Sequence, residues 1–264
     1  MPAITYENNL VIVEKGSRHV AVVTLSNPPM NLNTIESITE LREAFRKLKT
    51  DDDVRVVILT GSGRKAFNAG SDVSGFKHMK GNFKGIKFKL ELDMMNTIEF
   101  FPKPTICAIE GYCLGGGLEL ALTCDLRVVS ETAQFASPEI KLGLYPASGG
   151  LHRLPKLVGI AKAYEIMYLG DMFDAKEAYR LNLANKLAPE GKTISVAREM
   201  AERIAAFPPE ALAVIKQGIR EMWLRESQDC YYRNLDFIDR VFDGYNSVEG
   251  VEAFLEKRKP NFKF

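Results

Sequence analysis

Residues 110–120 read Glu-Gly-Tyr-Cys-Leu-Gly-Gly-Gly-Leu-Glu-Leu, with three successive glycines two residues before an acid. A helix that begins at the glycines would direct free backbone N–H groups and the positive end of its dipole at a ligand. Apolar residues flank Glu119, so its carboxylate would lose part of its hydration and its pKa would rise. The pattern predicts a general acid or base beside amides that form an oxyanion hole.

The same residues also allow a purely structural interpretation. The glycines would then permit a tight crossing of two helices, and Glu119 would be a half-exposed acid that favours the start of a helix. Taken alone, the pattern of residues 110–120 leaves both interpretations open.

A second acid and a second amide lie elsewhere in the chain. Twenty residues after Glu119, the sequence reads Ser137-Pro138-Glu139. Residues 54–60 form a β-branched run typical of a strand buried on both faces, and a glycine-rich segment follows it over residues 61–72. A turn at the end of such a strand can present another backbone amide near Ser71.

Four segments together resemble the enoyl-CoA hydratase/isomerase (crotonase) family, most closely its two-glutamate hydratases. They are residues 67–72, 110–120, 135–143 and 253–260, they follow the family's order, and the similarity covers nearly the whole chain. The resemblance implies that Glu119 and Glu139 are the catalytic acids. It also implies an oxyanion hole made by the amides of Ser71 and Gly116.

The resemblance implies further contacts, and the chain departs from the family pattern at two positions. The implied CoA-binding residues are Arg64, Lys65, Ala69, Phe254 and Lys257, with Phe254 and Lys257 one helical turn apart on an amphipathic terminal helix. The family commonly has glycine where this chain has Ala147, whose amide is expected to orient water while its methyl group reshapes the site. Asn182 also replaces a usual glycine.

An α/β fold follows from the alternation of segments. The resemblance makes it a crotonase-like spiral of β-β-α repeats over residues 1–191, which carries the acyl-CoA site, and a C-terminal helical region over residues 192–264 for trimerisation and CoA cover. The patterns predict strands at residues 19–26, 54–61, 104–110, 126–130 and 133–136. They predict helices at residues 35–48, 194–207, 209–225 and 228–243, with Asn33 or Thr34 as the first N-cap. Strands separated by helices predict parallel pairing.

Composition excludes several classes of protein. The formal net charge of +1 gives no global field for nucleic acid, and no apolar run is long enough to span a bilayer. The three histidines are isolated, the four cysteines show no C-x-x-C spacing, and the N-terminus does not resemble a signal peptide. We therefore expect a cytoplasmic protein with reduced cysteines and no metal.

One alternative motif fails on its context. Residues 61–66 formally match the dinucleotide fingerprint G-x-G-x-x-A, but no helical apolar stripe follows to receive a pyrophosphate.

Residues 76–89 contain five lysines and no acid. This lysine-rich segment is interpreted as a solvated face, and its functional alternative is a positive patch that steers CoA or holds a second carboxylate on an acyl chain.

The resemblance implies an enoyl-CoA hydratase that acts on enoyl-CoA and 3-hydroxyacyl-CoA thioesters and assembles as a homotrimer or a dimer of trimers. It would need no cofactor, because coenzyme A is part of the substrate. Three alternatives stay open: an enoyl-CoA isomerase or other crotonase-type enzyme, which usually keeps one of the two acids; a non-catalytic RNA- or partner-binding homologue, which requires an extended basic surface; and a structural oligomer without ligand.

Overall fold

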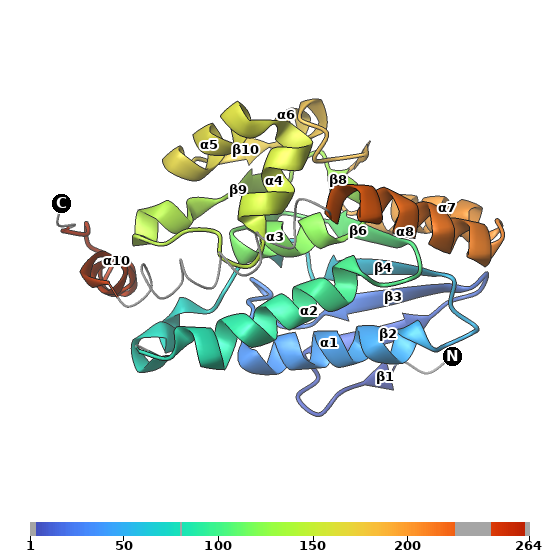
Figure 1. Ribbon diagram of the computed structural model, residues 1–264, viewed down its shortest axis with the longest axis horizontal. Coiled ribbons are helices and arrows are strands. Elements are labelled where there is room, and N and C mark those ends of the chain that lie inside the picture. The colour runs from blue at the N-terminus through green and yellow to red at the C-terminus, as the bar shows by residue number, and fades with distance from the viewer. Residues whose placement is uncertain (1–3, 80, 225–243, 262–264) are drawn as a thin grey trace.

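The computed structural model describes residues 4–79, 81–224 and 244–261. Within them, strands form two sheets (Figure 1). The larger sheet has the order β1 (Ile4–Thr5), β2 (Val11–Lys15), β3 (Val20–Leu25), β4 (Val56–Gly61), β6 (Thr105–Ile109), β8 (Leu126–Ser130) and β11 (Lys186–Ala188). The smaller sheet has the order β10 (Phe173–Asp174), β9 (Gln134–Ala136), β7 (Tyr112–Leu114) and β5 (Ala66–Asn68).

The chain alternates between the two sheets. Strands β4, β6 and β8 pair in parallel in the larger sheet, and each is followed by a short strand, β5, β7 or β9, of the smaller one. Helical segments then return the chain to the next repeat. This is the predicted spiral of β-β-α repeats, and it brings the ends of β5, β7 and β9 to one place.

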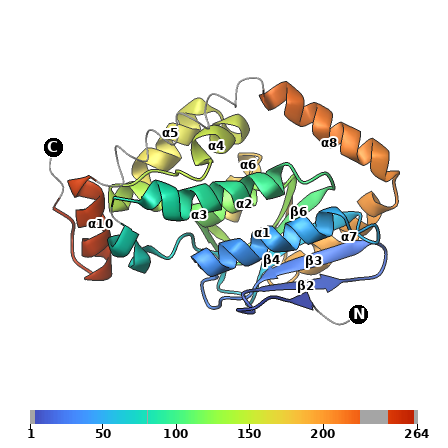
Figure 2. The same cartoon turned by 60° about the horizontal axis from the view of Figure 1, so that its bottom comes forward.

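Helices cover both faces of the larger sheet. Their bounds are α1 Ile35–Lys49, α2 Lys89–Glu99, α3 Gly116–Thr123, α4 Gly150–Val158, α5 Ile160–Leu169, α6 Ala175–Arg180, α7 Thr193–Ala205, α8 Pro209–Leu224 and α10 Tyr245–Leu255, with 3-10 turns η1 Val73–Met79 and η3 Pro138–Leu142 and a π-helical turn η2 Lys84–Phe88. Helices α1, α2 and α3 share one hydrophobic core with the sheet, and α7 packs on its other face through small residues. Figures 1 and 2 show α8 and α10 at opposite ends of the molecule.

The packing of the sheet explains the continuous apolar run seen in the sequence. All residues of β4 are buried, alternately against the α1 side and against Ala197 and Ala201 of α7. Because α7 completes this core, the chain just after residue 192 is packed on the sheet. The predicted division of the chain into a spiral core over residues 1–191 and a C-terminal helical region over residues 192–264 stays a prediction.

Most predicted elements are confirmed with small shifts in their ends. The five predicted strands appear as β3, β4, β6, β8 and β9, and the first predicted helix begins at a capping box between Thr34 and Ser37. The helix expected at residues 228–243 and Cys230 lie outside the described residues.

The other three cysteines are buried and free. No helix among the described residues combines the length and apolarity needed to cross a membrane.

Candidate active site

The first amide of the site comes from the start of α3. Gly115, which precedes the helix, has φ +52, a conformation that favours glycine. Its own N–H donates to the Ala136 carbonyl at 2.9 Å, which fixes the end of β7 beside β9. The amides that follow begin the helix and therefore have no partner within it. Gly116 is the first of them, and it lines a cavity.

The second amide comes from Ser71, which forms an isolated parallel bridge with Asn33. The Asn33 N–H donates to the Gly70 carbonyl at 2.8 Å, and the Asp72 N–H donates to the Asn33 carbonyl at 3.1 Å. In a parallel bridge, the residue between these two partners directs its own N–H to the opposite side. The Ser71 amide therefore points away from Asn33.

The two amide-bearing segments lie against each other. A methyl group on Gly70 would be 3.3 Å from the Gly116 nitrogen, and one on Gly116 would be 3.6 Å from the Ser71 hydroxyl oxygen. Gly117 packs still more tightly, since its methyl group would lie 2.0 Å from the Asn68 carbonyl oxygen. Glycine is required here for close approach of two backbones.

Glu119 lies in the first turn of α3 and is 4% exposed, so the half-exposed interpretation of this acid is wrong. The Gly150 N–H donates to its Oε1 at 2.7 Å. Burial raises the pKa of Glu119 well above its usual range, and the negative charges of Glu139 and Glu91 raise it further. A carboxyl in this environment is easier to protonate than one in water.

Glu139 approaches the same place from η3. The Ser137 hydroxyl donates to its Oε2 at 2.8 Å, whereas Oε1 is buried and has no hydrogen-bond partner among the described residues. A methyl group on Gly115 would be 3.2 Å from that oxygen, so the carboxylate lies beside the start of α3. Burial raises the pKa of Glu139 to about 7.

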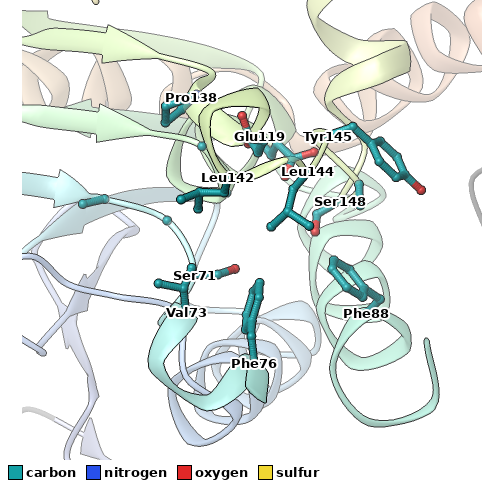
Figure 3. Close-up of a pocket in the computed structure, with 16 residues that line it drawn as sticks. Ser71, Val73, Phe76, Phe88, Glu119, Pro138, Leu142, Leu144, Tyr145 and Ser148 are labelled. Atoms are coloured by element: carbon teal, nitrogen blue, oxygen red, sulfur yellow. The ribbon is translucent and has the colours of Figure 1, made fainter. Parts of the chain in front are cut away.

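Both acids and both amide-bearing residues line one cavity of about 100 Å³ (Figure 3). In Figure 3, Ser71, Val73 and Phe76 face Glu119, Leu144 and Tyr145 across it. The lining residues are Ala69, Gly70, Ser71, Val73, Phe76, Phe88, Gly115, Gly116, Glu119, Pro138, Glu139, Leu142, Leu144, Tyr145, Ala147 and Ser148. An apolar chamber with a few convergent polar groups is the usual form of a small-molecule site.

The structure brings together six of the predicted site residues. Ala69, Ser71, Gly116, Glu119, Glu139 and Ala147 all line the cavity. The sequence did not reveal Gly150, whose amide binds Glu119; the paired glycines at residues 149–150 were the available signal. Arg153 stabilises this loop, because its Nη1 donates to the Ser148 carbonyl at 2.8 Å and its Nε donates to Glu99 at 3.0 Å.

The other four predicted CoA contacts lie outside the cavity lining. Arg64 and Lys65 are exposed in the turn between β4 and β5, and Phe254 is 59% exposed on α10. Lys257 is a correction: α10 ends at Leu255, and Lys257 has φ +56, so it does not continue the helix with Phe254. The dinucleotide motif is also excluded, because residues 61–66 lead into strand β5 rather than a helix.

Comparison with known proteins agrees with this geometry. Residues 15–264 match the model of the enoyl-CoA hydratase/isomerase family, and the chain belongs to that family. A probable enoyl-CoA hydratase of Bacillus subtilis is 37% identical over 246 residues, which cover 92% of this chain and 95% of that protein. A crotonyl-CoA hydratase of Syntrophomonas wolfei is 34% identical over 260 residues, which cover 98% and 99% of the two chains.

A solved structure shows the same fold. The crystal structure of an enoyl-CoA hydratase from Mycobacterium avium subsp. paratuberculosis superposes with a TM-score of 0.86 at 26% identity, covering 97% of this chain and 99% of that one. The predicted family and fold are confirmed, and so is the expectation that the chain is an enzyme of this family.

Proposed function

We propose that this protein is an enoyl-CoA hydratase that adds water reversibly across the 2,3 double bond of an enoyl-CoA thioester. The observation that carries the proposal is the buried carboxyl of Glu119 together with the half-buried carboxyl of Glu139, whose Oε1 is buried, in one cavity with the amides of Ser71 and Gly116. An enzyme that only moves a double bond needs one acid–base group at this place, whereas addition of water benefits from two.

In the proposed mechanism, the thioester carbonyl accepts hydrogen bonds from the amides of Ser71 and Gly116. An ionised glutamate takes a proton from water as its oxygen bonds to the β-carbon, and the π electrons move to the thioester oxygen as an enolate. The two amides stabilise that charge. A protonated glutamate then gives its proton to the α-carbon as the enolate collapses.

The two glutamates act as a coupled pair that shares one proton. Burial raises the pKa of both carboxyls, that of Glu139 to about 7 and that of Glu119 well above its usual range, so the shared proton can reside on either one. We therefore propose that both hold one water, with Ala147 near it, and assign no separate roles.

The pair predicts a bell-shaped dependence of kcat/KM on pH. Below about pH 7 the pair takes up a second proton and loses its base, so the rate falls. At higher pH the pair loses its remaining proton and has no acid, so the rate falls again. Initial rates with crotonyl-CoA across this range test the prediction; a profile flat through neutral pH would contradict it.

The cavity supports the binding of an acyl group. Most of its lining residues are apolar, and one relative bears the name crotonyl-CoA hydratase. Arg64 and Lys65 are proposed to bind the phosphates of CoA, and Phe254 and Lys257 its adenine end. Their exposure and the position of Ala69 at the cavity support this.

We also propose a homotrimer or a dimer of trimers. Apolar side chains are exposed along α8 at Val214, Ile215 and Ile219, where contact with another copy would remove them from water. Light scattering coupled to gel filtration should give three or six times the chain mass of 29.5 kDa. The mass of a single chain at micromolar concentration would exclude this assembly.

The activity itself is tested by product analysis. The protein is incubated with crotonyl-CoA in water enriched in oxygen-18, and the thioester is examined by mass spectrometry. Hydration gives a 3-hydroxybutyryl-CoA with one heavy oxygen at the β-carbon. A product that is an unhydrated isomer, or unchanged substrate with short, long and cyclic enoyl-CoAs alike, would exclude the hydratase proposal.

A further inference from the structure

Another buried carboxylate, Glu91, lies beside Gly116, and the proposed mechanism does not use it. Glu91 is in the first turn of α2 and is 0% exposed. Its Oε1 accepts a hydrogen bond from the Asn33 side-chain nitrogen at 3.2 Å, and its Oε2 is buried without a partner among the described residues. Burial of a carboxylate is costly, so this position needs an explanation.

Contacts at Gly116 place Glu91 against the oxyanion-hole segment. A methyl group on Gly116 would lie 3.3 Å from the Asn33 side-chain nitrogen and 3.4 Å from Glu91 Oε1. It would lie 3.6 Å from the Ser71 hydroxyl. The Asn33–Glu91 hydrogen bond therefore lies against Gly116, close to the Ser71 side chain.

Asn33 connects Glu91 to the position of Ser71. Its backbone binds both neighbours of Ser71, and its side-chain oxygen accepts a hydrogen bond from Asn68 Nδ2 at 2.7 Å. Asn68 in turn accepts the Gly70 N–H through its side-chain oxygen at 2.8 Å. Each link in this chain is buried, so a displacement of Asn33 is transmitted to the Ser71 amide.

Charged groups from several elements face Glu91. Lys87, which is 1% exposed, lies one turn before it, and its Nζ is 4.9 Å from the centre of the Phe76 ring that lines the cavity. The solvated-face interpretation is therefore wrong for Lys87. The Lys87 ammonium interacts with Glu91 and with Asp72, and Glu91 also acts on Glu119 in α3 and Glu139 in η3.

We propose that Glu91 is a positioning residue of the oxyanion hole, which fixes the Ser71 and Gly116 amides through Asn33 and acts by its charge on the two catalytic glutamates. This inference rests on the proposed function. The hydrogen bond and the charge make separable contributions. Leucine removes both of them, whereas glutamine keeps the acceptor for Asn33 and removes only the charge.

The test compares Glu91→Leu and Glu91→Gln with the wild type. The first readout is the red shift in absorbance of bound cinnamoyl-CoA, because polarisation of the conjugated carbonyl by the two amides produces that shift. The second is the pH profile of crotonyl-CoA hydration. Glu40→Gln is the matched control, since Glu40 is 5% exposed and accepts hydrogen bonds from the backbone N–H groups of Leu10 and Val11, where strand β2 begins.

Glu91→Leu should lose most of the red shift and lower kcat by about 10- to 100-fold, with a smaller change in KM. Glu91→Gln should keep the red shift and move both limbs of the pH profile to lower pH by about 0.5–1 unit, because a negative charge near Glu119 and Glu139 has been removed. Glu40→Gln should change neither readout.

A wild-type red shift in Glu91→Leu would overturn the positioning role. If that variant does not fold, an unmoved pH profile in Glu91→Gln would overturn the inference. Failure of the proposed function is distinguishable, because an inactive wild type that still red-shifts cinnamoyl-CoA would exclude hydration while leaving the positioning role measurable.

Discussion

Glu119→Gln is expected to lower kcat for crotonyl-CoA hydration by about 10²- to 10⁴-fold while the protein stays folded. Glutamine can still accept the Gly150 N–H, so the hydrogen bond at 2.7 Å is replaced rather than lost. It cannot exchange a proton with water or the enolate. Because burial already disfavours the charged acid, thermal unfolding should occur at the same or a higher temperature than in the wild type.

Glu139→Gln should have a similar effect, since each member of the pair needs the other. Glu110→Gln is the matched control: Glu110 is 6% exposed and accepts hydrogen bonds from Thr193, away from the cavity lining. It should retain wild-type kcat. Wild-type rates in both Glu119→Gln and Glu139→Gln would show that the acid pair is structural.

Gly117→Ala is expected to reduce the free energy of unfolding by about 3 kcal/mol or more. The added methyl group would meet the Asn68 carbonyl oxygen at 2.0 Å and its carbonyl carbon at 2.7 Å. Because these are backbone atoms of β5, α3 and the smaller sheet must separate. Chemical denaturation, or the yield of soluble protein if the variant does not fold, measures the loss.

Gly218→Ala provides the comparison for Gly117→Ala. Gly218 lies in α8, and a methyl group there meets no atom within 4 Å. Alanine favours helix over glycine by up to about 1 kcal/mol, so this variant should be as stable as the wild type or more so. Equal stability of the two alanine variants would contradict the close approach of α3 to β5.

The sequence predicted the elements whose side chains repeat over several residues. The run at residues 54–60 identified β4, and helical spacing identified α1. Strands β5 and β7 were not predicted, because three residues are too few to show a period. Strand β2 was also missed, and its antiparallel pairing with β3 departs from the parallel pairing predicted for the sheet.

The site was predicted where a residue's chemistry depends on its own segment. Gly116 and Glu119 belong to one helix start, and the family resemblance supplied Ser71 and Glu139. Asn182, which stands where the family usually has glycine, has φ +61, a left-handed conformation that asparagine tolerates.

Roles that depend on contacts between distant segments could not be predicted. The bond from Gly150 to Glu119 joins α4 to α3, and the bond from Asn33 to Glu91 joins the start of α1 to α2. Similarly, Met94 and Met95 are buried in the core, whereas Phe100 in the same segment is exposed. In each case burial is decided by tertiary packing, which the local pattern does not contain.

The most direct test of the central claim is the initial rate of crotonyl-CoA absorbance loss, measured side by side for the wild type and the Glu119→Gln/Glu139→Gln double variant. Both proteins are first shown to bind crotonyl-CoA. We expect the wild type to consume the conjugated thioester until equilibrium, and the double variant to be about as slow as either single variant, because the two acids act as a unit. Hydration by the double variant at the wild-type rate would contradict the two-glutamate account.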